Sequence, residues 1–282
     1  MPCPFLRAGR ARYCHAATVR KLILDGPGAT EGGLCASPEY GMCTLVSPEE
    51  KGAARCPHLE EMHVQYCGAA PIAKLVPFSD SPGSPCAGEG YRYCDSYLMR
   101  ARPHGASQPA PSLLYAANHL WLDVAEGGLC HIGIDAFLAA SAGALDRVTF
   151  VNSHGTHRPS VALTVNGVEW PMMFPNPMLI QSVNARVRSH PKVVTADPYG
   201  SGWLFEGWEL PGKTRAGLIS GPQAAAWQTE ERERLAHYVN DTQGLNGDGG
   251  YAVSGVARLL SHPEVVCLFQ EFFSKTSWAS EE

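Results

Sequence analysis

The sequence lacks any long apolar run: none approaches the roughly 20 residues that a membrane-spanning helix needs. Its opening stretch also lacks an apolar segment long enough for a secretory signal peptide. There is no basic surplus, because 22 lysines and arginines stand against 27 aspartates and glutamates, which argues against a general nucleic-acid binder. With 45% hydrophobic and 17% charged residues, the 282-residue chain has a globular composition. We therefore expect a soluble, cytoplasmic protein without a membrane span.

Catalytic signatures are missing as well. The sequence contains no G-x-S-x-G, no H-E-x-x-H and no glycine-rich loop that would cradle phosphate. Four histidines of the central region could suggest metal or acid–base chemistry, but structural or surface roles are the simpler interpretation: His119, His131, His154 and His157. The sequence therefore predicts no catalytic residue and favours a protein that is not an enzyme.

Cysteine is abundant and concentrated at one end of the chain. Eight of the ten cysteines lie in the first 94 residues. The charge balance changes too, since residues 1–100 are neutral overall and the remainder carries the whole net charge of −5. A domain boundary is therefore expected near residue 100. The two remaining cysteines, Cys130 and Cys267, are expected to be inert, apolar-face side chains.

The eight N-terminal cysteines form a tandem repeat. Cys3-Pro4-Phe5-Leu6 is separated by six residues from Tyr13-Cys14, and Cys56-Pro57-His58-Leu59 is separated by six residues from Tyr66-Cys67. Each copy then closes with the pattern C-A-x-x-x-Y-x-x-C, at 35–43 and at 86–94. The cysteines are 11, 21 and 8 residues apart in the first copy and 11, 19 and 8 in the second. Agreement at this many positions indicates a duplicated four-cysteine unit.

Each unit is too short to bury a stable core unaided, so a covalent or metal staple is expected. Four thiolates suit a structural zinc ion or an iron–sulfur cluster. The lack of a C-x-x-C pair weakens the zinc interpretation, and the lack of an export signal weakens disulfides, but neither alternative is removed. We predict two zinc ions or two iron–sulfur clusters, held by Cys3, Cys14, Cys35, Cys43, Cys56, Cys67, Cys86 and Cys94. Whether each site uses one repeat or mixes both is left open. His15, His58 and His63 do not recur between the copies and are expected at the surface.

The chain from residue 113 to residue 210 has the pattern of a β domain. Short β-rich runs alternate with turns, and Asn166-Gly167 between two such runs predicts a hairpin with a type I′ turn. A short helix is expected over 135–144. The apolar run Trp170-Pro171-Met172-Met173-Phe174 is either a core strand or an exposed patch that binds a partner.

Several of these residues resemble the H protein of the glycine cleavage system. The most specific element is D-P-Y-G-S-G-W-L at 197–204; the others are N-H-L-W at 118–121, G-I-D-A-F at 133–137, Val183-Asn184 and Pro191. The resemblance covers residues of about 113–210. It implies a lipoyl-carrier fold, a flattened β-barrel sandwich, and a lysine at a hairpin tip that carries lipoate.

The lysine that the resemblance calls for is absent. Pro175 and Asn184 keep the family's spacing, and counting back from them places the lipoyl-lysine position on Gly167. No lysine occurs between Lys74 and Lys192. The resemblance therefore implies the fold without the cofactor: we predict no lipoate and no cofactor-binding residue in this domain.

The last part of the chain is expected to be helical. One helix is predicted from Pro222 to Val239, and a second is expected to begin with Ser261 as its N-cap and Pro263 in its first turn. The expected architecture is an α+β multidomain protein, in which a small metal-stapled cysteine module precedes a mainly β sandwich and a helical segment. The expected divisions are 1–50 and 51–99 for the two repeats, 100–112 for a proline-rich linker, 113–212 for the β domain and 213–282 for the helices.

Three functions follow from these features. The first is a metal-binding adaptor that presents two four-cysteine modules and a non-lipoylated H-protein-like domain to a protein partner. The second is an iron–sulfur protein for electron transfer or redox sensing. The third is an accessory of a lipoate-linked or glycine-cleavage-like system that docks without carrying lipoate.

Overall fold

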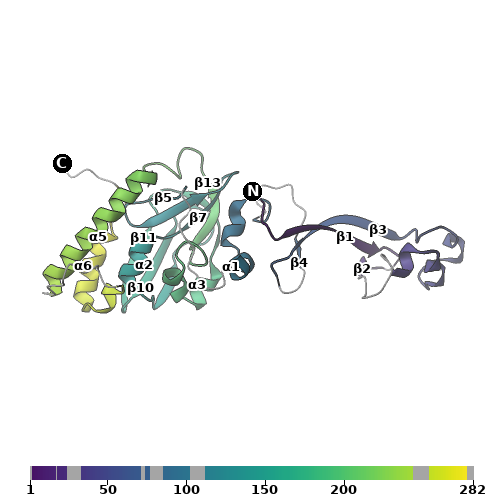
Figure 1. Ribbon diagram of the computed structural model, residues 1–282, viewed down its shortest axis with the longest axis horizontal. Coiled ribbons are helices and arrows are strands. Elements are labelled where there is room, and N and C mark those ends of the chain that lie inside the picture. Colours follow the sequence, from purple (N-terminus) through teal and green to yellow (C-terminus); the bar gives the residue numbers. More distant parts are fainter. Residues whose placement is uncertain are drawn as a thin grey trace. The chain divides into compact units, whose positions relative to one another are not determined.

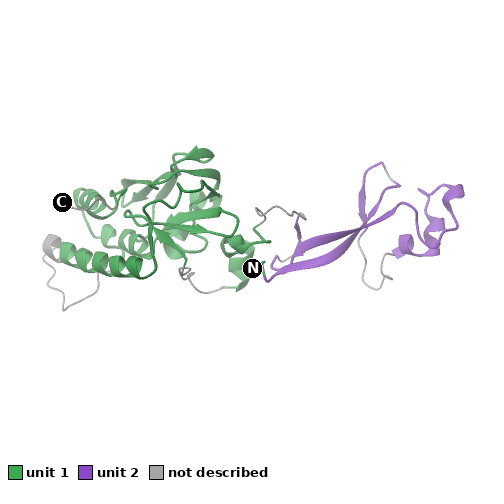
Figure 2. Ribbon diagram, turned by 90° about the horizontal axis from the view of Figure 1, so that it is seen from above, with its two compact units in different colours: residues 1–3, 82–282 green, residues 4–81 purple. Residues whose placement is uncertain are grey.

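The computed structural model describes residues 2–16, 18–23, 33–70, 74–76, 85–101, 112–243 and 254–277. The chain forms two compact units: residues 4–81, and residues 1–3 together with 82–282 (Figure 2). This division falls at neither of the repeat boundaries expected near residues 50 and 99. Most of the expected linker, residues 102–111, lies outside the described residues.

The smaller unit is a four-stranded antiparallel sheet in which the two repeats pair with each other (Figure 1). The long strand of each repeat lies at the centre, and the register joins Leu6 to Cys67 and Cys14 to Leu59. A short strand from each repeat completes each edge, giving the order β2-β1-β3-β4. A lone two-stranded hairpin is marginal in water, so the duplication supplies the strands that one copy lacks. The elements are β1 (Leu6–Cys14), β2 (Lys21–Ile23), η1 (Gly33–Ala36), η2 (Pro38–Met42), η3 (Pro48–Glu50), β3 (Leu59–Cys67) and β4 (Lys74–Val76).

The larger unit contains two β-sheets, as the mainly β prediction for this region required. A seven-stranded sheet has the order β14-β5-β6-β7-β13-β12-β9, and a three-stranded sheet has the order β11-β10-β8. The expected antiparallel pair across residues 126–128 is confirmed as β6 and β7. The strands are β5 (Leu114–Tyr115), β6 (Leu120–Val124), β7 (Leu129–Ile134), β8 (Arg147–Phe150), β9 (Gly155–His157), β10 (Ser160–Val165), β11 (Val168–Met173), β12 (Met178–Val183), β13 (Phe205–Glu209) and β14 (Ile219–Ser220).

Helices surround these sheets, and the sequence located most of them. The short helix expected after residue 135 is α2, and Asp135 is its N-cap, accepting a hydrogen bond from the Leu138 amide at 2.9 Å. The helix expected from Ser261 is α6, where Ser261 and Glu264 form a capping box. The helices are η4 (Glu89–Tyr93), α1 (Asp95–Ala101), α2 (Ala136–Ala142), α3 (Ala185–Ser189), α4 (Lys192–Ala196), α5 (Gly221–Gln243), η5 (Val256–Arg258) and α6 (His262–Phe272).

The C-terminal helices share one core with the β-sandwich. Leu235 of α5 and Leu268 of α6 belong to the same buried cluster as the sheet residues. Trp170 of β11 is fully buried and stacks on Phe273, with ring centroids 5.1 Å apart. The apolar run at 170–174 is thus a core strand, and the exposed-patch alternative is wrong for Trp170, Met172 and Phe174, which are all buried.

The two cysteines outside the repeats differ from each other. Cys130 is fully buried in β7, as expected. Cys267 is exposed, which corrects its assignment to the apolar face of α6. The buried face of that helix contains Val265, Leu268 and Phe272, and the adjacent position 267 projects about 100° away around the helix.

None of the helices in the described residues is long and apolar enough to cross a membrane.

Candidate functional site

The hairpin turn at Asn166-Gly167 is the place where the sequence analysis located the missing lysine. Asn166 (φ 49°) and Gly167 (φ 76°) are both left-handed, as a type I′ turn requires, so the expected turn is confirmed. The strands β10 and β11 pair up to Val165 and Val168 on either side. Gly167 has no side chain that could be acylated.

The segment before α6 lies against this turn. Asn166 donates side-chain hydrogen bonds to the carbonyl oxygens of Ala257 (3.3 Å) and Leu260 (3.1 Å). A Cβ atom at residue 167 would lie 3.3 Å from Nε2 of His262, which is tighter than ordinary van der Waals contact. The turn is therefore flanked on one side by residues 257–262.

The exposed carboxylate of Asp146 ties the same turn to the C-terminal segment. The Gly167 amide donates to Oδ2 of Asp146 at 3.0 Å, and Arg258 donates to Oδ1 of Asp146 at 2.7 Å. Partial burial alone would raise the pKa of Asp146, but the Gly167 amide and the Arg258 guanidinium outweigh it and the pKa is lowered. Asp146 thus holds the turn and η5 together as a carboxylate.

The structure gathers four of the predicted cysteines within the smaller unit. Cys56 donates its amide hydrogen to the Cys35 carbonyl at 2.9 Å, and the two side chains share a hydrogen bond. Cys35, Cys43 and Cys56 belong to one small apolar cluster around Tyr40. Cys14 pairs with Leu59, which packs against that cluster. All four are free thiols.

The nearby cysteines change the pKa of the Cys35 thiol. Its pKa is raised first by burial and then by the nearness of Cys56, Cys14 and Cys43. Among the described residues, however, no three histidine, cysteine, aspartate or glutamate side chains are arranged as ligands of one metal ion. The four thiols are therefore neighbours that do not converge on one point.

The other four predicted cysteines occupy equivalent positions in the repeat. The Cys3 amide donates to the Cys86 carbonyl at 2.9 Å, as Cys56 does to Cys35. Cys94 caps η4 through the Tyr91 carbonyl (3.0 Å), as Cys43 caps η2 through Tyr40 (2.8 Å). Cys67 ends β3 as Cys14 ends β1.

His119 is part of a buried charged group that sequence reasoning missed. Its Nδ1 atom lies 2.8 Å from Oδ2 of Asp135 and its Nε2 atom lies 3.7 Å from Oε2 of Glu231. The ring stacks on Phe137 and on Trp227, each with centroids 4.4 Å apart. No motif joins these residues, because Glu231 lies on α5, more than 100 residues after His119. The group links α5 to the sheet, and the structural role expected for His119 is consistent with it.

The segment 85–101 packs on the β-sandwich through Tyr93. The Tyr93 hydroxyl donates to Oδ2 of Asp123 at 2.7 Å, and Arg92 donates to the same oxygen at 3.0 Å. The Tyr93 ring stacks on His131, with centroids 4.0 Å apart. The end of the second repeat is thereby anchored on the β domain. The remaining two histidines, His154 and His157, are exposed as expected.

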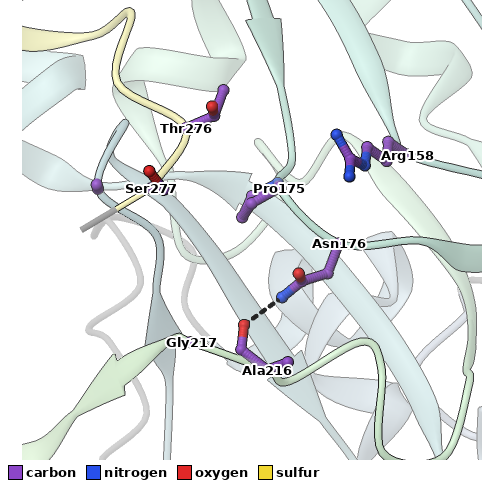
Figure 3. A pocket seen from close by; sticks show the side chains of 8 residues that line it. Arg158, Pro175, Asn176, Ala216, Gly217, Thr276 and Ser277 are labelled. Atoms are coloured by element: carbon purple, nitrogen blue, oxygen red, sulfur yellow. Dashed lines mark hydrogen bonds between the residues drawn. The ribbon is translucent and has the colours of Figure 1, made fainter. Parts of the chain in front are cut away.

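A cavity of about 470 Å³ opens beside the loop before β12 (Figure 3). Its lining is mostly small side chains and backbone, and Asn176 closes one wall by donating to the Ala216 carbonyl at 2.6 Å. Among the described residues of the lining, Arg158 is the only charged one.

The two sheets and the hairpin at Asn166-Gly167 define a β domain of the lipoyl-carrier type. The family model for the glycine cleavage H-protein matches residues 113–216. The glycine cleavage system H protein of Salinibacter ruber is 31% identical over 118 residues, which span 40% of this chain and 93% of that relative. This chain belongs to the glycine cleavage H-protein family through this domain. A crystal structure of an H protein from Mycobacterium marinum has a TM-score of 0.37 at 22% identity, covering 43% of this chain and 98% of the other.

Proposed function

We propose that the protein is a non-catalytic, metal-binding adaptor whose H-protein-like domain binds a protein partner but does not carry lipoate. The observation that carries this proposal is the turn at Asn166-Gly167, where counting back from Pro175 and Asn184 puts glycine at the position expected for the acylated lysine. The contacts of Asn166 with Ala257 and Leu260 support it further, because they place protein against the turn that a swinging arm would need free.

The partner that suits this domain is an enzyme of a lipoate-linked or glycine-cleavage-like system. The matched residues span nearly the whole of the Salinibacter ruber relative, so a docking surface of the family could persist without the lysine. In that role the protein would be an accessory that occupies a docking site without passing on a substrate.

The cysteine module supplies the metal-binding part of the proposal. Four neighbouring thiols in the smaller unit favour metal over isolated reactive cysteines. Iron–sulfur chemistry, with a role in electron transfer or redox sensing, is the second candidate, because four cysteines also suit a cluster. We place the protein in the cytoplasm, where thiols stay reduced and available to metals.

Two measurements test the adaptor. The first is the intact mass of the protein after expression in a host that lipoylates an authentic H protein: we expect no lipoyl adduct, and an adduct on any residue would contradict the proposal. The second is a glycine cleavage reaction driven by an authentic H protein and titrated with this chain. An accessory that docks the same enzymes lowers the rate, whereas an unchanged rate at large excess would rule out that partner class.

The metal is tested on anaerobically purified protein by its visible spectrum and by its content of iron, sulfide and zinc. A colourless protein with zinc supports the adaptor. A brown protein with iron and sulfide supports the electron-transfer alternative. A protein with neither metal contradicts both.

A further inference from the structure

We propose that Cys14, Cys35, Cys43 and Cys56 bind one zinc ion, so that three ligands come from the first repeat and the fourth from the second. This inference rests on the proposed metal-binding function and adds the ligand set, which the sequence left open. All four residues lie in the smaller unit, within residues 4–81.

The antiparallel pairing of the repeats explains why the set crosses the repeat boundary. Arg10 pairs with His63, and these two residues hold the same position in the two copies. The sheet is therefore symmetric about this pair, so the end of β1 lies beside the beginning of β3. Cys14 is the last residue of β1, and Cys56 precedes β3 by three residues.

Backbone hydrogen bonds hold this end of the sheet together. The His15 amide donates to the His58 carbonyl at 3.0 Å, which continues the pairing beyond Cys14. The Cys56 amide donates to the Cys35 carbonyl at 2.9 Å, which joins the start of the second repeat to the loop of the first. Cys3, the cysteine that would complete the first repeat by sequence order, belongs to the other compact unit.

The loop that supplies Cys35 and Cys43 is built around one buried tyrosine. Tyr40 is 1% exposed; its hydroxyl accepts from the Gly52 and Ala53 amides and donates to the Glu50 carbonyl. The Cys43 amide is fixed on the Tyr40 carbonyl at 2.8 Å. Tyr40 belongs to the same apolar cluster as Cys35, Cys43 and Cys56. These hydrogen bonds fix the conformation of the loop that contains Cys35 and Cys43, as expected of a loop that supplies metal ligands.

Four cysteine side chains near one another are the ligand set of a structural zinc ion, which binds cysteine as the thiolate. The sulfur atoms do not yet surround one point, so binding requires them to draw together, with loss of the Cys35–Cys56 hydrogen bond.

The contact between Cys35 and Cys56 favours a single ion over a four-iron cluster. Two sulfurs bound to one tetrahedral zinc lie about 3.8 Å apart, a separation close to a thiol–thiol hydrogen bond. A four-iron cluster takes one cysteine at each iron, which spreads the four sulfurs further apart.

The test counts zinc in paired serine variants of the full chain. The sequence predicts a second zinc ion bound by cysteines outside this set, so the parent is expected to hold two zinc ions. The variant C14S/C56S removes two ligands of one proposed site and should lose one zinc ion per chain. The variant C3S/C14S removes one ligand from each set and should lose both. Sites built from single repeats predict the reverse: two ions lost in C14S/C56S and one in C3S/C14S.

Two controls keep these outcomes separate from unfolding and from failure of the proposed function. C14S/C35S should lose one ion under either arrangement, and C267S, at an exposed cysteine, should lose none. All six tryptophans lie beyond residue 113, so their fluorescence reports whether the larger unit stays folded. Two zinc ions in the parent with the reverse pattern would overturn the ligand set alone. A parent that lacks zinc would overturn the metal-binding function itself.

A second measurement does not depend on a variant that folds. X-ray absorption at the zinc edge of the parent should show four sulfur ligands at about 2.3 Å. A nitrogen or oxygen ligand in the shell would contradict the four-thiolate set.

Discussion

The Nε2 atom of His119 lies 3.7 Å from Oε2 of Glu231, inside the core that the β-sandwich shares with the C-terminal helices. Neither atom makes a hydrogen bond to any residue that the structure describes, and both side chains are buried. On the other side of the ring, Nδ1 lies 2.8 Å from Asp135. The two carboxylates favour the protonated form of the ring, and the group links α5 to the sheet.

This buried group predicts a pH dependence of stability. Burial alone would lower the pKa of His119, but Asp135 and Glu231 outweigh it and raise the pKa above its ordinary value of 6.5. Because the folded-state pKa is raised, the contribution to stability is complete below pH 6.5 and is lost as the pH rises through the raised folded-state value. We expect the free energy of unfolding, measured in urea, to fall over this window.

The variant Asp135→Asn tests the origin of that fall. Asparagine is a good N-cap, so α2 keeps its cap while the charge is removed. Leaving the other partners of a buried ionic group uncompensated costs about 3–5 kcal/mol. We expect a loss of this order at pH 6 and a flatter pH profile. Glu169→Gln, in the exposed pair with Arg147, serves as control and should change stability by less than about 1 kcal/mol. An unchanged pH profile in D135N would contradict the role of His119.

The turn at residue 167 predicts what a restored lysine would do. In Gly167→Lys, the side chain enters a left-handed position next to His262, which costs about 1–2 kcal/mol. Residues 257–262 still flank the turn, so we expect the intact mass to show little or no lipoyl adduct in a host that fully modifies an authentic H protein.

The double variant G167K/H262A removes the closest neighbour of the new side chain. More adduct than in G167K would identify His262 as part of the obstruction. Complete modification of G167K alone would show that only the lysine is missing and that the C-terminal segment does not shield the turn.

The sequence predicted the local structure of the β domain well because its signals are local. The Asn-Gly turn, the capping box of α6 and the N-cap Asp135 each depend on a few adjacent residues. The buried group around His119 was not predictable, since its members meet only through tertiary packing. Cys267 was misplaced because the sequence alone does not fix which helix face is buried.

The contacts between cysteines in the N-terminal module were likewise not predictable from the sequence. The repeat identified eight equivalent cysteines, but it could not say which of them meet. That depends on the antiparallel register of β1 and β3, which places Cys14 opposite Leu59. A parallel pairing of the same strands would have brought different cysteines together.

Removal of the Tyr40 hydroxyl tests how much the stability of the cysteine loop depends on its hydrogen bonds. In Tyr40→Phe, the Gly52 and Ala53 amides lose their acceptor at 3.0 and 2.8 Å. Gly52 and Ala53 are exposed, so water can replace the lost acceptor, and each lost hydrogen bond costs about 0.5–1.5 kcal/mol. We expect faster release of zinc to a chelator and lower thermal stability of the smaller unit. Tyr13→Phe is the control, since that ring stacks with Arg20 and its hydroxyl makes no hydrogen bond within the described residues. Equal effects of the two variants would contradict a special role for Tyr40.

Loss of the Tyr93 hydroxyl is expected to loosen the packing of residues 85–101 on the β domain while the β domain stays folded. Its hydroxyl donates to Asp123 at 2.7 Å, and hydrogen bonds to a charged acceptor contribute about 1.5–3 kcal/mol. In Tyr93→Phe we expect the hydrogen exchange rate of residues 85–101 to rise by roughly 10- to 150-fold, the equivalent of this energy. Exchange in β6 and β7 should change little. Arg92 still pairs with Asp123 at 3.0 Å, which keeps the carboxylate compensated and limits the effect to the segment. Tyr91→Phe, at a half-buried position of the same 3-10 helix, should leave exchange nearly unchanged. Acceleration spread evenly through the sandwich would instead mean that Tyr93 supports the whole domain, because the ring also stacks between His131 and Trp121.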